Sequence, residues 1–140
     1  MIKVVHMNEV SELEYEQFFK EGHAKDQKPQ EEWAKEHGYF LELEGQRIGY
    51  FVLYPVKDGV WLRKLLMKEQ ANPALIIMTF EWISEYAQRV GYEKLFAHVD
   101  DPNRETLFEM NHFKESAQSP YPEANLDGKW YEKLLIVNAE

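Results

Sequence analysis

Residues 62–113 decide the fold, and they read LRKLLMKEQANPALIIMTFEWISEYAQRVGYEKLFAHVDDPNRETLFEMNHF. The apolar run at 62–67 predicts a buried strand. Residues 74–91 predict a long helix, because their apolar positions fall on two adjacent helical stripes, and Gly91 is a natural stop for it. Residues 94–99 return as a strand. A strand, a helix and a second strand in this order predict a right-handed parallel crossover.

The N-terminal part of the chain alternates between strand and helix signals. Residues 2–6 form a short β-branched run that predicts the first strand. Ser11 and Glu14 have capping-box spacing, which predicts a helix that reaches about Gly22. A polar segment follows as a loop, and Pro29 suits the first turn of a second, short helix in QEEWAKEH.

From Tyr39 the apolar pattern changes to a period of two, which predicts strands. Turn signals at Gly45-Gln46 and Lys57-Asp58-Gly59 separate three such runs, so we expect an antiparallel meander. A short helix and a closing pair of strands complete the pattern, at residues 104–111, 113–116 and 129–137. The sum is a single mixed α/β domain over residues 1–140.

Composition limits the class of protein. Apolar residues make up 44% of the chain and aromatic residues 14%, which excludes a disordered protein. The formal net charge of −9 disfavours nucleic acid, and it mildly favours cationic small molecules or basic peptides, although a role in solubility explains it equally well. There is no cysteine, so disulfides, thiolate metal sites and cysteine nucleophiles are excluded. No segment has the pattern of a signal peptide or a membrane span, so we expect a soluble cytoplasmic protein.

This order of elements resembles the GNAT superfamily of N-acetyltransferases across nearly the whole chain. GQRIGYFVL resembles the second and third strands of the family, and DGVWLRKLLM resembles its fourth strand. The resemblance implies a GNAT-like fold, in which four antiparallel strands lead to a parallel strand–helix–strand crossover, and it implies acetyl-CoA as cosubstrate. It also implies that the backbone of Leu66 and Met67 contacts the pantetheine chain, while the pyrophosphate lies on the start of the following helix.

The turn that would hold the pyrophosphate contains no glycine. The resemblance places further cofactor contacts in this turn and its flanks, at Lys68, Gln70, Ala71, Asn72, Ala74 and Leu75. Gln70 fits the family's pattern, but Pro73 and Leu75 stand where small residues belong, and proline removes an amide donor. Two interpretations stay open. Asn72 and Pro73 cap the helix themselves, or the turn is a modified phosphate site with Lys68 as its positive charge.

A second motif of the family also differs here. The segment TLFEMNHF has Phe108 where the family has the tyrosine that protonates the departing thiolate. Asn103, a further cofactor contact, lies two residues nearer to Leu107 than is usual in the family. Loss of a proton donor costs about 10²–10⁴ in rate without abolishing transfer. Tyr121 and Tyr131 are candidates to replace it, with ordinary packing as the alternative for both.

His98 and Glu69 are the candidate catalytic residues. His98 and Asp100 lie two apart near the end of the fifth strand, which in the family borders the acyl-transfer site, so His98 is a candidate general base. A histidine hydrogen-bonded for structural reasons is the alternative. Glu69 is a candidate base acting through a water, or an ordinary surface carboxylate. The histidines show no paired ligand spacing, so no metal site is expected.

Two functional hypotheses follow. The first is an N-acyltransferase that moves an acetyl group from acetyl-CoA to a small-molecule or peptide amine, mainly by positioning and by backbone stabilisation of the oxyanion. Glu14, Glu31 and Glu32 are candidates to attract a cationic acceptor. The second is a catalytically inactive GNAT-fold module that binds a ligand or another protein. We expect no nucleic-acid or membrane partner, and a homodimer is left open.

Overall fold

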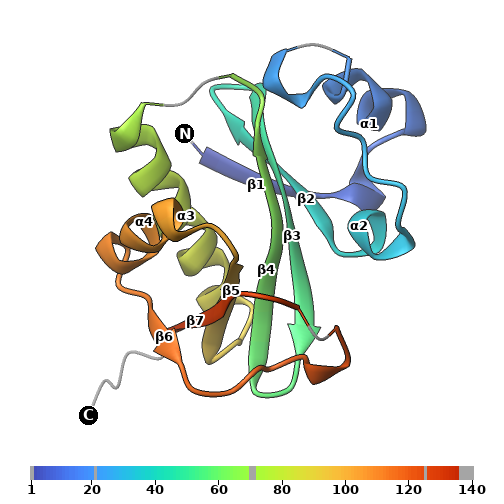
Figure 1. Ribbon diagram of the computed structural model, residues 1–140. Helices are drawn as coiled ribbons and strands as arrows, with labels where there is room; N and C mark the ends of the chain where they lie inside the picture. The colour runs from blue at the N-terminus through green and yellow to red at the C-terminus, as the bar shows by residue number, and fades with distance from the viewer. Residues whose placement is uncertain (1, 21, 70–71, 125, 136–140) are drawn as a thin grey trace. The chain divides into compact units, whose positions relative to one another are not determined.

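The computed structural model describes residues 2–20, 22–69, 72–124 and 126–135 (Figure 1). The strands are β1 (Ile2–His6), β2 (Gly38–Leu43), β3 (Gln46–Val56), β4 (Gly59–Met67), β5 (Lys94–Val99), β6 (Lys114–Ser116) and β7 (Lys129–Leu134). The α-helices are α1 (Glu12–Phe18), α2 (Glu32–Glu36), α3 (Pro73–Arg89) and α4 (Glu105–Met110). Short 3-10 helices are η1 (Met7–Glu9), η2 (Gly22–Ala24), η3 (Pro102–Arg104) and η4 (Pro122–Ala124). Gln70 and Ala71, two of the expected cofactor contacts, lie outside the described residues.

The predicted meander and crossover are confirmed. The strands hydrogen-bond in the order β1-β2-β3-β4-β5-β7-β6. β1, β2 and β3 pair antiparallel, and a two-residue turn leads from β3 to its neighbour β4. β4 and β5 pair in parallel with α3 between them in the chain, and β7 pairs antiparallel with both β5 and β6. The mixed α/β class is therefore correct.

The backbone contacts divide the chain into two compact units. The first comprises residues 1–54 and 63–74, and the second comprises residues 55–62 and 75–140. β3 and β4 each contribute residues to both units. In the described part of the chain, no helix is long and apolar enough to cross a membrane.

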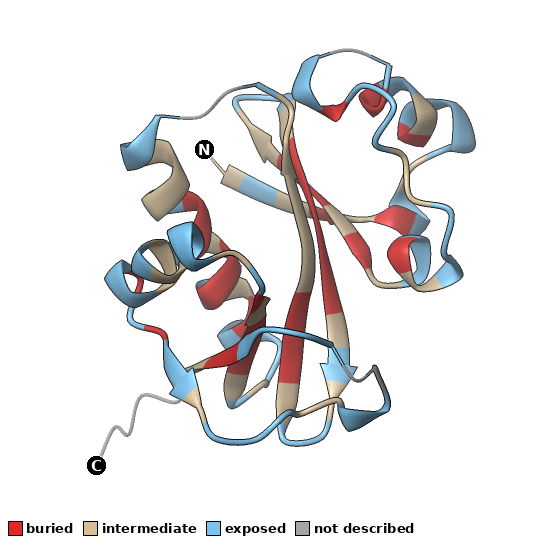
Figure 2. Ribbon diagram, in the orientation of Figure 1, coloured by how far each residue is buried: buried red, intermediate tan, exposed pale blue. Residues whose placement is uncertain are grey.

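The first unit has an aromatic core between its helices and its strands (Figure 2). The buried cluster consists of Val5, Met7, Tyr15, Phe18, Phe19, Ala24, Ala34, Phe40, Tyr50 and Val52. The Phe18 ring lies 5.0 Å from the Phe40 ring, and the buried Tyr50 hydroxyl donates to the carbonyl of Ala34. Burial raises the pKa of Tyr50. This hydroxyl therefore ties α2 to β3 while its ring contributes to the apolar core.

The two N-terminal helices are shorter than predicted. The capping box of Ser11 and Glu14 is present, but α1 ends at Phe18, and the following residues change to tighter three-residue hydrogen bonds. α2 begins at Glu32, so the expectation that Pro29 opens it is wrong. The first hairpin turn lies at Glu44 and Gly45, which both have positive φ as a two-residue hairpin loop requires, one position before the predicted turn.

In the second unit, α3 packs through one buried stripe of side chains, which includes Phe80, Ile83 and Ala87. Gly91 ends the helix as predicted. Its φ is +107°, its N–H donates to the Gln88 carbonyl, and the Tyr92 N–H donates to the Ala87 carbonyl. These two bonds form a Schellman motif, in which glycine tolerates the left-handed position without a steric cost.

The C-terminal elements also agree with the sequence pattern. α4 occupies most of the predicted segment, and η3 precedes it. The closing strand pair is β6 with β7, and β7 ends at Leu134, within the predicted segment. β7 lies between β5 and β6 in the strand order, so it connects the closing pair to the crossover.

Candidate functional site

Lys68, the first residue after β4, fixes which way the backbone of this strand points. The Lys68 N–H donates to the Ile48 carbonyl of β3 over 2.9 Å. Successive residues of a strand direct their backbone groups to opposite edges. The backbone of Met67 therefore points to the edge away from β3, whereas that of Leu66 points toward β3. Of the two expected pantetheine contacts, only Met67 has the required orientation, and the contact itself stays a prediction.

The pairing between β4 and β5 is short. It consists of Val60 with Leu95 and Trp61 with Phe96. β4 continues to Met67 and β5 continues to Val99, but the described residues contain no further pair between them. Beyond Trp61, one edge of β4 is therefore not paired with β5.

The side chains of β4 indicate an irregularity in the same place. The Arg63 guanidinium stacks on Trp33 of α2 and on Tyr54, with its central carbon 3.9 Å and 4.7 Å from the two ring centroids. Leu66 packs against the core on the side of α1 and α2. Three positions separate Arg63 and Leu66, so a regular strand would direct them to opposite faces. Their common side indicates a β-bulge, a device that ends pairing and redirects side chains.

Helix α3 begins at Pro73, one residue before the predicted start. Asn72 is exposed and precedes the helix, while Ala74 and Leu75 lie in its first turn. Proline suits this first position because it has no amide hydrogen, so the start of α3 carries one donor fewer than a glycine would give it. Both interpretations of this turn remain open.

The connection between α1 and α2 lies directly on the end of β4. Gly22 has a φ of +69°, and a Cβ atom at this position would collide with the Lys68 carbonyl oxygen. The next residue, His23, donates its backbone N–H to the same oxygen over 2.6 Å. Only glycine satisfies both the left-handed conformation and the close approach. The Lys68–Glu69 segment is thereby held against the α1–α2 connection, within the first unit.

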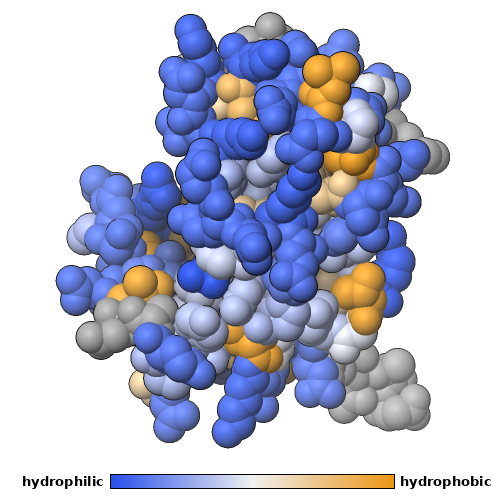
Figure 3. Space-filling view, turned by 90° about the vertical axis from the view of Figure 1, so that its right-hand side faces the viewer, coloured by the Kyte–Doolittle hydropathy of each residue, from blue (hydrophilic) through white to orange (hydrophobic). Residues whose placement is uncertain are grey.

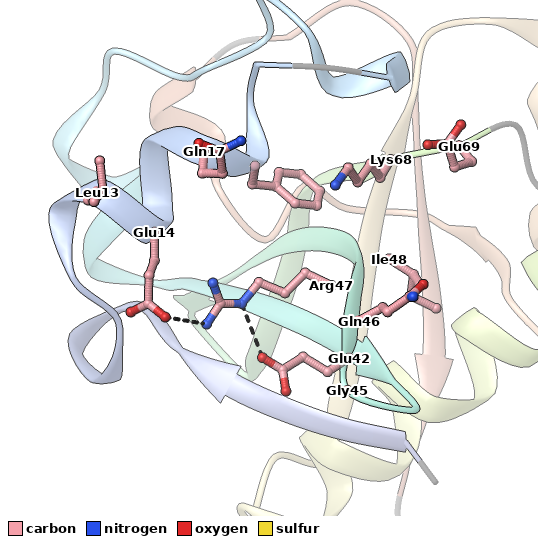
Figure 4. Close-up of a pocket in the computed structure, with 11 residues that line it drawn as sticks. Leu13, Glu14, Gln17, Glu42, Gly45, Gln46, Arg47, Ile48, Lys68 and Glu69 are labelled. Atoms are coloured by element: carbon pink, nitrogen blue, oxygen red, sulfur yellow. Dashed lines mark hydrogen bonds and ion pairs between the residues drawn. The ribbon is translucent and has the colours of Figure 1, made fainter.

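A cavity of about 780 Å³ lies beside this segment, inside the first unit (Figure 4). α1, the β2–β3 hairpin and the end of β4 contribute its lining residues: Leu13, Glu14, Gln17, Phe18, Glu42, Gly45, Gln46, Arg47, Ile48, Lys68 and Glu69. Its volume falls in the range of small-molecule sites, and its lining combines an apolar wall with a few polar groups.

Arg47 is the centre of the polar part of this cavity. Its Nε donates to Glu42 over 3.1 Å and its Nη2 donates to Glu14 over 3.3 Å, and its guanidinium lies 4.9 Å from the centre of the Phe40 ring. Glu14 also accepts the backbone N–H of Ser11. The Ser11 N–H, and then Arg47, hold the pKa of Glu14 below its usual value, so this carboxylate is ionised at neutral pH.

The candidate base His98 lies in the second unit, inside an aromatic group. Its ring is 5.1 Å from that of Trp130, and Trp130 is 4.9 Å from Trp61. The His98 Nε2 atom is buried and has no hydrogen-bond partner in the described part of the chain. A Cβ atom at Gly128 would lie 3.2 Å from this nitrogen, so Gly128 covers it. This nitrogen is therefore neither satisfied by a neighbour nor open to an amine.

The candidate replacements for the missing tyrosine occupy two different environments. Tyr131 is 1% exposed and stacks on Phe108, and its hydroxyl donates to Glu105 over 3.1 Å. Burial, and then Glu105, raise the pKa of Tyr131 to about 12. This hydroxyl is thus already engaged as a donor. Tyr121 packs against Trp61 with ring centres 5.6 Å apart.

The predicted site residues are distributed over both units. Leu66, Met67, Lys68, Glu69, Asn72 and Ala74 belong to the first, and Leu75, His98 and Asn103 belong to the second. Asn103 lies in η3, where its N–H donates to Asp101. The described residues contain no group of three or more potential metal ligands.

Sequence reasoning missed Arg47 and Glu42. A signal existed, because these residues flank the hairpin turn as a directly opposed pair of opposite charge. Such pairs occur in many hairpins without a functional role, so the pattern alone does not identify a cavity.

Comparison with known proteins gives a consistent fold. No protein-family model and no curated protein matches the sequence. Among solved structures, the N-acetylglutamate synthase from Neisseria gonorrhoeae, complexed with coenzyme A and N-acetyl-glutamate, superposes with a TM-score of 0.71 at 15% identity. That match covers 98% of this chain and 36% of the synthase, so this chain spans about a third of that protein.

Two shorter proteins match over almost their whole length. A GNAT family acetyltransferase from Elizabethkingia anophelis with acetyl-CoA bound gives a TM-score of 0.64 at 13% identity, over 95% of this chain and 97% of that one. The ribosomal-protein-S18-alanine N-acetyltransferase from Escherichia coli gives 0.61 at 15% identity, over 100% and 97%. Together with the strand order and the parallel crossover, these matches show that the chain has the GNAT acetyltransferase fold.

Proposed function

We propose that this protein is an acetyltransferase that moves an acetyl group from acetyl-CoA to an amine acceptor. The observation that carries the proposal is the early end of the β4–β5 pairing at Trp61 and Phe96. It leaves an edge of β4 on which an extended chain with amide groups can pair as an added strand would. Similar structures that contain coenzyme A or acetyl-CoA support this choice of cosubstrate.

The residues of β4 and α3 fit such a cosubstrate in part. The backbone of Met67 points to the edge away from β3, where a pantetheine amide would pair with it. The start of α3 offers an anion the amide groups of its first turn and the positive end of the helix dipole, with Lys68 close by in sequence. Pro73 removes one of those amide groups, so we expect weaker pyrophosphate binding than a glycine-containing turn would give.

Acetyl-CoA supplies the acyl group as a reactive thioester, and this chain supplies position and proton transfer. Glu69 is exposed and lies on the lining of the cavity (Figure 4). It is accessible to a water that takes the proton from the attacking amine. His98 stays a candidate, but the burial of its Nε2 favours Glu69 for this role.

A second function, the binding of a ligand or a partner without catalysis, is supported by different residues. Phe108 has no proton to donate, the hydroxyl of Tyr131 is bound to Glu105, and Pro73 weakens the expected phosphate site. A protein with these features can keep the fold and bind a ligand or a partner without catalysis.

An acetyl-transfer assay tests the proposal. The full chain is mixed with acetyl-CoA and a panel of amines, amino acids and peptides, thiol release is followed over time, and acetylated products are identified by mass spectrometry. We expect transfer, a fall of about 10²-fold in Glu69→Gln with a changed pH profile, and little effect of His98→Gln. Binding of coenzyme A without any transfer supports the second function instead. Absence of both binding and transfer contradicts both.

A further inference from the structure

Lys133 of β7 lies on the side of its strand that the helices of the second unit cover. Charged side chains usually lie at the surface, as they do on the mostly hydrophilic face shown in Figure 3. Side chains two positions apart on a strand share a face. Tyr131 is 1% exposed and stacks on Phe108 of α4, so Lys133 belongs to the same covered face, where it is half-buried.

The amino group of Lys133 has uncharged neighbours. Its Nζ donates to the Oγ of Ser84 over 3.0 Å, and the buried Ser84 donates its own hydroxyl hydrogen to the Phe80 carbonyl over 2.8 Å. The centre of the Phe113 ring lies 5.9 Å from the same nitrogen, at the outer limit of a cation–π contact. No carboxylate in the described part of the chain forms an ion pair with Lys133. The ammonium form is therefore partly removed from water without a neutralising partner.

These neighbours change the protonation of the amine. Burial lowers the pKa of the Lys133 ammonium, and the negative charge of Glu81 on α3 raises it again in part. A larger share of this amine is then neutral, and only the neutral amine has the lone pair that attacks a carbonyl carbon. Lys129 lies on the same strand but is exposed, and its Nζ pairs with Glu105 over 3.4 Å. It serves as an internal reference.

From the position of Lys133 and its uncharged neighbours, we infer that this lysine is an acylation site, which acetyl-CoA modifies in preference to the exposed lysines of the chain. The amine nitrogen attacks the thioester carbonyl carbon and forms a C–N bond. The C–S bond breaks, its electron pair leaves with the sulfur of coenzyme A, and a proton from the attacking nitrogen passes to that thiolate.

The product of this step suits the site. Acetyl-lysine is a neutral amide, so the modification removes the charge that burial disfavours. Its remaining N–H can still donate to Ser84. The step uses none of the residues assigned to acetyl transfer under the proposed function, so it does not depend on that activity.

Competitive labelling of the full chain tests the inference. The chain is treated with a limiting amount of acetyl-CoA at about pH 8, and peptide mass spectrometry gives the acetylation rate of each lysine. We expect Lys133 to react about threefold to tenfold faster than Lys129, because its larger neutral fraction outweighs the weaker nucleophilicity of a weaker base. Acetic anhydride, which needs no cofactor site, should show the same preference, and urea should abolish it.

Three results of this labelling overturn the inference. The first is a rate at Lys133 equal to or below that at Lys129 in the folded chain. The second is a preference that persists in urea, because it would then come from the local sequence. The third is a preference with acetyl-CoA that acetic anhydride does not share, because bound acetyl-CoA and not the environment of the amine would then cause it. Failure of the separate acetyl-transfer assay overturns only the proposed function.

Two exposed carboxylates of α3 provide a matched pair of variants. Glu81→Gln removes the negative charge that opposes the effect of burial, so we expect acetylation of Lys133 to rise about twofold. Glu85→Gln, also exposed on α3, should leave this rate unchanged. Both changes lie at the surface, so neither is expected to disturb folding. An unchanged or slower acetylation of Lys133 in Glu81→Gln contradicts the inferred role of its environment.

Discussion

The two units of the molecule use their polar side chains differently. In the first unit, Arg47 is held by two carboxylates and still presents a nitrogen to a cavity. In the second unit, the hydroxyl of Tyr131 is bound to Glu105, and Phe108 occupies the position of the expected proton donor. The Nε2 of His98 is buried and has no hydrogen-bond partner among the residues that the structure describes.

From this difference we expect a ligand to bind in the first unit. A polar group that is oriented but not saturated can bind a ligand, whereas a buried and saturated one stabilises the fold. We therefore expect substitutions of the polar residues that line the cavity of the first unit to change ligand binding, and those around Phe108 and Tyr131 to change stability or rate.

The largest expected effect concerns Gly22, which holds the end of β4 in the first unit. In Gly22→Ala, the left-handed φ and the collision with the Lys68 carbonyl together lower the free energy of unfolding by about 3 kcal/mol. Gly45→Ala is the matched control, because Gly45 also has a positive φ but a Cβ there meets nothing within 4 Å. It should lose only about 1 kcal/mol. Urea unfolding measures both, and equal losses would show that the contact with β4 has no energetic role.

A tyrosine in place of Phe108 would restore a hydroxyl to the second unit. Phe108→Tyr should raise the rate of acetyl transfer about tenfold, because a phenol at this position can protonate the departing thiolate. Its effect on stability is followed by thermal unfolding, since Phe108 packs against Phe80 and Phe113. An unchanged rate in a stable variant would show that the missing hydroxyl does not limit the reaction.

A smaller effect on stability is expected at the C-terminal ends of α3 and α4. Both helices end in the same hydrogen-bond pattern, the Schellman motif. His112 has a φ of +73° where Gly91 has +107°. His112→Gly should stabilise the protein by about 1 kcal/mol, because glycine adopts this conformation without strain, and Gly91→Ala should destabilise it by a similar amount. Denaturant midpoints measure both. A loss of stability in His112→Gly would mean that the His112 side chain makes a stabilising contact.

The smallest effect is a pH dependence. Burial raises the pKa of Tyr131 to about 12, above its value of about 10 in an unfolded chain. Its contribution to stability is therefore complete below pH 10 and is lost as the pH rises toward 12, because the unfolded state ionises first. Tyr131→Phe should show a smaller decrease of stability over this range. Tyr50 contributes to the decrease in both proteins, so only the difference between them is informative.

Much of the fold could be predicted from the sequence because local signals agree with it. Ser11 with Glu14 fixes the start of α1, Gly91 fixes the end of α3, and the period of two marks the strands of the meander. The start of α2 could not be read in this way. Pro29 is compatible with a first helical turn, but the helix begins where Trp33 and Ala34 can pack on the rest of the first unit.

The candidate site was less predictable. The cavity depends on Arg47, Gln17 and Lys68, which are far apart in the sequence and meet only through strand pairing and the packing of α1. The role of Gly22 depends on a close approach to Lys68 that no local pattern encodes. His98 was identified from its position near a strand end, but the sequence does not show that Gly128 covers its Nε2.

Calorimetric titration of the full chain with coenzyme A tests the central claim most directly. We predict binding of one molecule per chain, with an affinity that increases about tenfold in Pro73→Gly, because this change returns an amide donor to the first turn of α3. Pro29→Gly, in the α1–α2 connection, is the control and should leave the affinity unchanged. No detectable heat with millimolar coenzyme A, in the natural chain and in Pro73→Gly, would contradict the proposal that this GNAT fold binds its cosubstrate.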